Sequence, residues 1–161
     1  MIFQEILQIQ DKLIDFSPNS KIWVYYSDKD FSLNQAVIQE EIDSFTQSWK
    51  SHGDKVVAQG FVLGGNVIIL VADTSQSEVS GCSTDSSVHF IQSLGTKYNL
   101  DFFNRNTVFY ILNDRISTIS MNEIATIQHD TFVFNPFFKD LNEWRNGFVQ
   151  KLNESKYKRL L

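Results

Sequence analysis

Residues 55–73 read KVVAQGFVLGGNVIILVAD, in which two apolar segments are separated by Gly64-Gly65. Valine, isoleucine and phenylalanine favour extended backbone, so residues 55–63 and 66–73 are predicted strands. A tight turn between antiparallel strands needs positive φ at its centre, which glycine adopts without steric cost. The stretch therefore predicts a β-hairpin near the middle of the chain.

The segments on either side of the hairpin each predict a strand and a helix. Upstream, residues 22–26 (IWVYY) are rich in strand-forming types, and an apolar stripe at helical spacing runs from Leu33 to Trp49. Downstream, residues 88–98 repeat the helical spacing and residues 107–112 (TVFYIL) predict a strand. The order β-α-β-β-α-β predicts an α+β fold, an antiparallel sheet with helices on one face in the split, ferredoxin-like arrangement. Another antiparallel sheet with helical cover is the alternative.

Both ends of the chain predict further helices. Residues 2–15 carry apolar side chains at helical spacing, and residues 137–156 do so after Pro136. Gly53 is expected to end the helix before the hairpin in the left-handed conformation. The chain holds two prolines, seven glycines and no repeat or linker, so we expect one domain over residues 1–161.

The charge of the chain argues against a nucleic-acid partner. It has 14 basic and 19 acidic side chains, a net charge of −5 and a pI near 5.1, whereas a duplex-binding protein needs a basic face. The charge is uneven, since residues 139–161 hold six basic and three acidic groups. A solvated helix that complements an acidic body explains this tail, and an anionic partner is the alternative.

Several absences in the sequence predict a cytoplasmic location. Cys82 is the single cysteine, so no intramolecular disulfide forms, and residues 1–5 lack the positive start of a signal peptide. The longest aliphatic run, residues 67–72, is far shorter than the ~20 residues that a membrane helix needs. The three histidines and the cysteine have no metal-ligand spacing, so we expect no metal, no other cofactor and no membrane contact.

Residues 80–89, SGCSTDSSVH, form the most promising polar segment for ligand chemistry. The segment leads from a polar loop into a helix, whose first N–H groups are unpaired and carry the positive end of the helix dipole. Such a helix start binds anions. The candidate ligand-binding residues are therefore Gly81, Ser83, Thr84, Asp85 and Ser86.

Cys82 gives the same segment a second interpretation. A helix start stabilises a thiolate, which lowers the pKa of a thiol and raises its reactivity. If the helix begins near Ser83, His89 lies about two turns from Cys82 and reaches it only where the loop folds back. Cys82 and His89 are therefore the candidate catalytic pair of a thiol-dependent enzyme. The simpler interpretation is structural, with a polar side chain capping the helix and Cys82 as a small buried residue.

Segments spread over nearly the whole chain resemble a family of short bacterial proteins, mostly uncharacterised, that often carry the label ABC transporter ATPase. The most specific of them is Ser-Gly-Cys-Ser at 80–83; the others are residues 23–27, Phe45, Trp49, His52-Gly53, 84–88, 103–105, 133–135 and 158–160. The label implies ATP hydrolysis, but the chain has no Gly-x-x-x-x-Gly-Lys-Ser/Thr loop to hold the phosphates. The resemblance therefore implies no established activity, and we expect no ATP hydrolysis.

The sequence thus leaves three functional hypotheses open. The first is a non-catalytic interaction module, because the chain is rich in aromatic residues and lacks a complete catalytic set; its partner would be a second copy or another protein. The second is a small-ligand, anion or thiol site at residues 80–89. The third is an adaptor contacted through the basic tail.

Overall fold

The predicted hairpin lies at the centre of the molecule. The computed structural model describes residues 1–73, 75 and 81–161, with backbone alone for 81–83. Strand β4 (Val57–Leu63) turns at Gly64-Gly65, with φ of 60° and 71°, into strand β5 (Val67–Asp73). Strand β1 (Lys21–Tyr26) pairs with the other side of β5, and all three strands are antiparallel in the order β1-β5-β4.

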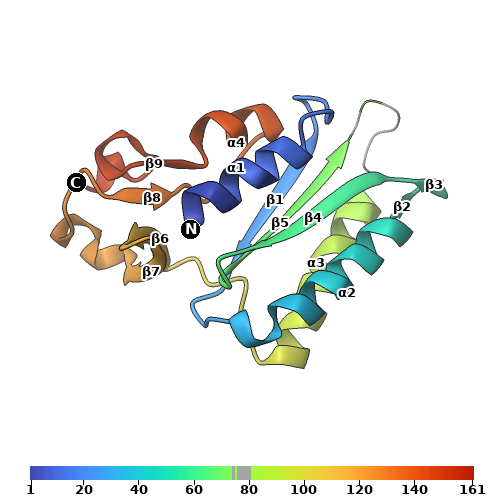
Figure 1. The fold of residues 1–161 in the computed structure, drawn as a ribbon, viewed down its shortest axis with the longest axis horizontal. Coiled ribbons are helices and arrows are strands. Elements are labelled where there is room, and N and C mark those ends of the chain that lie inside the picture. The colour runs from blue at the N-terminus through green and yellow to red at the C-terminus, as the bar shows by residue number, and fades with distance from the viewer. Residues whose placement is uncertain (74, 76–80) are drawn as a thin grey trace.

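Strand β5 is buried on both faces because helices cover each side of this sheet (Figure 1). Val67, Ile69 and Val71 pack toward helix α1 (Ile2–Lys12). Ile68 and Leu70 pack toward helices α2 (Gln35–Ser48) and α3 (Gly81–Tyr98) on the opposite face. This alternation explains why a nearly continuous apolar run is stable as a strand.

A second antiparallel sheet stands beside the first, in the order β7-β6-β8-β9 (Figure 1). Its strands are β6 (Thr107–Leu112), β7 (Arg115–Ser120), β8 (Phe132–Phe134) and β9 (Val149–Lys151). The β6–β7 turn is made by Asn113 and Asp114, both at positive φ. Phe109 of β6 and Phe134 of β8 belong to the same apolar cluster as α1 and β5, so one core joins the two sheets.

The predicted α+β class, with antiparallel strands and with α2 and α3 on one face, is confirmed. The ferredoxin-like arrangement is only partly formed, because it needs all four of its strands in one sheet and β6 lies in another sheet than β1. The order β1-β5-β4 matches the first three strands of that arrangement, whereas β6 pairs with β7 and β8 in the second sheet. No strand of the described residues pairs with the outer edge of β1.

The end of the chain also differs from the prediction. The expected helix over 137–156 is shortened to α4 (Leu141–Gly147), whose cap residue Asp140 accepts a hydrogen bond of 2.9 Å from the Glu143 backbone. Glycine is a poor helix former, and after Gly147 the chain becomes β9, which pairs with β8. Two short 3-10 helices, Leu152–Glu154 and Lys158–Leu160, follow.

Three smaller elements complete the fold. Gly53 has positive φ as predicted, but it turns the short hairpin of β2 (Lys50–Ser51) and β3 (Asp54–Lys55) and does not cap α2. Two 3-10 helices span Ser32–Asn34 and Met121–Thr126. None of the helices in the described part of the chain combines the length and apolar character needed to span a bilayer.

Candidate functional site

The outer edge of β1 presents unpaired backbone groups. The Ser27 amide donates to the Asn66 carbonyl over 2.8 Å, which fixes Ser27 as a residue that faces β5. In an antiparallel ladder such residues alternate with residues whose N–H and C=O point the other way. The backbone of Ile22, Val24 and Tyr26 therefore points away from β5, and no hydrogen bond to these groups occurs among the described residues.

The same alternation is confirmed at the beginning of the strand. Ser20 belongs to the outward-facing set, and its carbonyl accepts a hydrogen bond of 2.9 Å from the Leu141 backbone at the start of α4. Helix α4 thus covers the outer edge at Ser20. From Ile22 onward the edge is open as far as the described residues go.

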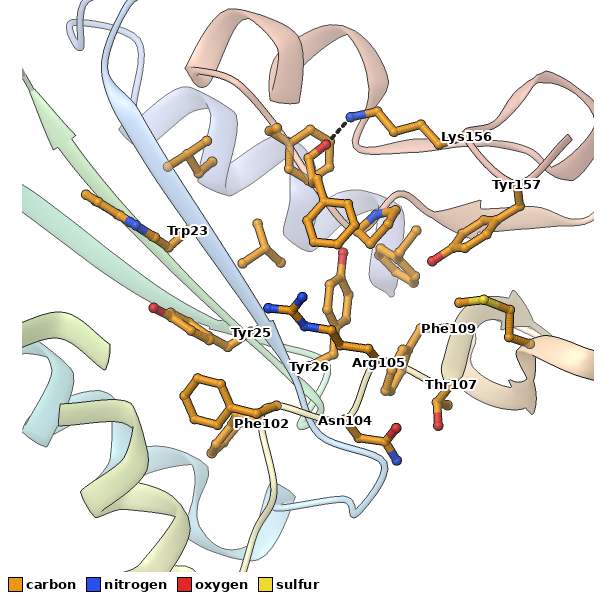
Figure 2. A pocket seen from close by; sticks show the side chains of 18 of the residues that line it. Trp23, Tyr25, Tyr26, Phe102, Asn104, Arg105, Thr107, Phe109, Lys156 and Tyr157 are labelled. Atoms are coloured by element: carbon orange, nitrogen blue, oxygen red, sulfur yellow. Dashed lines mark hydrogen bonds between the residues drawn. The ribbon is translucent and has the colours of Figure 1, made fainter. Parts of the chain in front are cut away.

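A cleft of about 850 Å³ runs along this open edge, between the two sheets (Figure 2). This is within the usual volume of a ligand-binding site. Its lining comes from β1, the start of α3, the segment before β6, strands β6 and β8, the 3-10 helix after β7, the segment after β8, and the end of the chain: Lys21, Ile22, Trp23, Val24, Tyr25, Tyr26, Thr84, Val88, Phe102, Phe103, Asn104, Arg105, Thr107, Phe109, Met121, Phe134, Pro136, Phe137, Phe138, Lys139, Lys156, Tyr157, Arg159 and Leu160.

Aromatic side chains form both walls of the cleft. On the side of α2 and α3, Phe103 lies edge-on to Tyr25 with ring centroids 5.8 Å apart, and Phe102 packs in the same cluster. On the side of the second sheet, Tyr26 stacks on Phe109 at 4.9 Å. A chain lying along β1 would direct alternate side chains toward these two apolar walls.

Hydrogen bonds hold the wall on the side of the second sheet in place. The Tyr26 hydroxyl crosses to the second sheet and donates to the Asn135 carbonyl over 2.7 Å. The buried Asn135 side chain donates to the Gly147 carbonyl and accepts from the Lys156 backbone, so it connects β8, α4 and the chain end. Burial raises the pKa of Tyr26 well above its usual value and raises the pKa of Tyr157 to about 12. Both phenols are therefore neutral at physiological pH.

Among the candidate anion-site residues with described side chains, one, at the start of α3, lines this cleft. Thr84 is half-buried and lines the cleft, whereas Asp85 and Ser86 are exposed outside its lining. The side chains of Gly81 and Ser83 lie outside the described residues. Anion binding at this helix start stays a prediction.

Thiol chemistry at Cys82 and His89 also stays a prediction. Helix α3 begins at Gly81, two residues earlier than expected, so positions 82 and 89 belong to one helix and their Cα atoms are about 10 Å apart along its axis. Position 82 therefore lies in the helix itself and not in the loop before it. His89 is exposed, and the Cys82 side chain lies outside the described residues. Among the described residues, no three histidine, cysteine, aspartate or glutamate side chains gather as metal ligands.

Sequence reasoning missed the cleft because its lining comes from segments far apart in the chain. One signal pointed toward it. Lys139, Lys156 and Arg159, three of the cations in the basic tail, border the cleft. The sequence therefore showed the excess of basic residues in the tail, although it did not show the cleft that three of them border.

Comparison with models of protein families, with curated proteins and with solved structures finds no match to this chain.

Proposed function

We propose that the chain is a binding module that takes an extended polypeptide segment of another protein as a fourth strand beside β1. The observation that carries this proposal is the open edge at Ile22, Val24 and Tyr26, which faces a cleft of ligand-binding size. Strand addition satisfies such an edge with main-chain hydrogen bonds, while the flanking pockets select the side chains. The proposal develops the first of the three hypotheses from the sequence, a non-catalytic interaction module, by assigning its binding surface to the β1 edge.

The position of the edge favours a single segment over a second copy of β1. The edge is recessed between the segment that carries Phe102 and Phe103 and the segment that carries Phe137 and Phe138. Pairing two copies edge to edge would bring these walls of one copy against the walls of the other. One extended chain has no such walls and can enter the cleft.

Fluorescence anisotropy with three labelled peptides tests the proposal. The peptides share the core Val-Thr-Val-Thr-Val and carry two aspartates, two asparagines or two lysines on each side of it. Two further versions of each are methylated on the backbone nitrogen of alternate core residues. In an added strand only alternate residues direct their N–H toward β1. We expect one methylation pattern to abolish binding and the other to leave it intact.

A matched pair of protein variants tests the same contact from the other side. Val24→Pro removes an outward-facing N–H, which proline can replace on an edge strand without breaking the ladder to β5. Val24→Thr keeps that N–H. We expect binding to be lost in the first variant only. Equal binding by both variants, or equal effects of both methylation patterns, would contradict strand addition; a concentration-dependent dimer lost in Val24→Pro would assign the edge to a second copy.

A further inference from the structure

Among the residues that the structure describes, the cleft is lined by cations and by no carboxylate. Five basic side chains line it: Lys21, Arg105, Lys139, Lys156 and Arg159. The chain as a whole has more acidic than basic groups, 19 against 14. A positive cleft on a negative protein is therefore a local feature, and it attracts an anionic ligand.

Two of the five cations are already near a carboxylate. The Lys156 ammonium lies 2.6 Å from Glu143 and also donates to the Phe137 carbonyl. The Lys139 backbone donates to the other oxygen of Glu143 over 3.3 Å, and the pKa of Glu143 is lowered chiefly by the hydrogen bond from Lys156. Within the described part of the chain, Lys21, Arg105 and Arg159 form no ion pair. As far as the described residues go, the positive charge of these three side chains in the cleft is not compensated by an ion pair.

Arg105 is held at one end of the open edge. The residues around it, Asn104 and Thr107, both donate to Asp28 just beyond β1, over 3.2 and 3.1 Å. Phe103, on the same segment as Arg105, packs against Tyr25 of β1. Figure 2 shows the Arg105 side chain reaching from this segment toward β1.

The other end of the edge carries lysines. Lys21 is the first residue of β1, and Lys139 lies two residues before Leu141, whose amide binds the Ser20 carbonyl. Between the two ends lie residues 22–26, about 15 Å of strand at the usual rise per residue. The open edge is therefore flanked by positive charge at both ends.

We infer, on the basis of the proposed strand addition, that the bound segment is acidic. It would place carboxylates on either side of about five residues that pair with β1. Its backbone pairs with Val24 and its neighbours, its apolar side chains contact the aromatic walls, and its carboxylates approach Arg105 and Lys21. A single-stranded nucleic acid would match the charge and the aromatic rings, but it has no alternating N–H and C=O groups to pair with the edge.

The three core peptides measure this preference directly. At low ionic strength we expect the aspartate peptide to bind about tenfold more tightly than the asparagine peptide, and the lysine peptide to bind most weakly. The advantage of the aspartate peptide should shrink as salt is added, because exposed charges are screened. The asparagine peptide should show little salt dependence.

Charge-removing variants locate the effect within the cleft. Arg105→Gln and Lys21→Gln should each reduce the advantage of the aspartate peptide over the asparagine peptide about threefold. Lys55→Gln removes the same charge from exposed strand β3, outside the cleft lining, and serves as the control. It should leave the preference intact.

The outcomes separate the two proposals. If all three peptides bind equally and Arg105→Gln has no effect, the inference of an acidic segment is overturned while strand addition stands. If none of the peptides binds, both are overturned. If an oligothymidylate of about eight nucleotides displaces the aspartate peptide, and if it binds Val24→Pro and the native chain equally tightly, the cleft is a nucleic-acid groove and both proposals are wrong.

Discussion

The two edges of the first sheet differ in whether their outward-facing backbone groups have hydrogen-bond partners. At the β4 edge, the Gln39 side chain of α2 donates to the Gly60 carbonyl and accepts from the Val62 amide, each over 3.0 Å. A side-chain amide has the same donor and acceptor as a peptide group, so Gln39 occupies the place of one residue of an added strand. At the β1 edge no such group is present among the described residues, and a cleft takes its place.

The difference indicates which edge is structural and which is available to a ligand. Exposed edges promote aggregation, and natural proteins cover them with helices or loops. Helix α2 covers β4 directly, whereas β1 is only recessed between aromatic walls. A recessed edge is shielded from another sheet and remains accessible to a single extended chain. Four predictions test this contrast, beginning with the largest expected effect.

Gly60→Ala should force α2 away from the β4 edge. A Cβ atom at this position would lie 2.3 Å from Cγ2 of the fully buried Ile42 and 2.8 Å from Leu70 Cδ2. We expect the free energy of unfolding to fall by about 3 kcal/mol, because overpacking a closed site strains its neighbours. Urea denaturation measures this. Gly147→Ala, whose Cβ would meet nothing closer than 3.7 Å, should cause no loss, and a loss equal to that of Gly60→Ala would contradict the close approach of α2.

The same substitution on both edges compares them directly. Val62→Pro removes the amide that Gln39 accepts from, and it should lower the free energy of unfolding by about 2 kcal/mol. Val24→Pro removes an amide without a partner among the described residues and should cost less than about 1 kcal/mol. Thermal and urea unfolding of the two variants give the difference. Equal losses would show that the β1 edge is not open.

Gln39→Ala should expose the β4 edge without crowding it. We expect a loss of about 1 kcal/mol in the free energy of unfolding, because the Gly60 carbonyl and the Val62 amide lose their partner and form hydrogen bonds with water in its place. Glu40→Ala, at the next and exposed position of α2, is the matched control. Light scattering at rising concentration should also show self-association of Gln39→Ala. A stable, monomeric Gln39→Ala would mean that Gln39 does not protect the edge.

The last prediction concerns alkaline pH and Tyr157, which lines the cleft. Burial raises the pKa of Tyr157 to about 12, whereas an unfolded tyrosine ionises near 10. The folded state therefore retains this proton in a range where the unfolded chain has lost it. Stability from this group is complete below pH 10 and is lost as the pH rises toward about 12. Between pH 10 and about 12, the free energy of unfolding of Tyr157→Phe should fall less than that of the native chain. If the two free energies fall in parallel with pH, Tyr157 is exposed to water and its pKa is not raised by burial.

Local patterns in the sequence were sufficient for the elements of the first sheet. The turn at Gly64-Gly65 and the apolar run of β5 are local signals, and so are the helical stripes of α1 and α2. The pairing of β6 is not local. The strand itself was predicted with its observed bounds, but its residues do not reveal whether it joins β1 or β8.

The structure of the end of the chain and of the cleft also depends on contacts between distant residues, which local sequence patterns do not determine. Apolar residues at 141, 144, 148 and 152 match a helix, but Gly147 weakens it and the edge of β8 supplies β9 with hydrogen-bond partners. A cleft assembled from separated segments follows only after these pairings are known. The uneven charge of the tail and Thr84 at the start of α3 were the parts of the cleft that the sequence indicated.

Amide hydrogen exchange at Val24 and Val62 is the most direct measurement of the central claim. In the free protein we expect the Val24 amide to exchange fast and the Val62 amide, bonded to Gln39, to exchange slowly. Addition of the aspartate peptide should protect Ile22, Val24 and Tyr26 and leave Trp23 and Tyr25, which face β5, unchanged. A Val24 amide that is already protected in the free protein, or that gains no protection when the peptide is bound, would contradict the account.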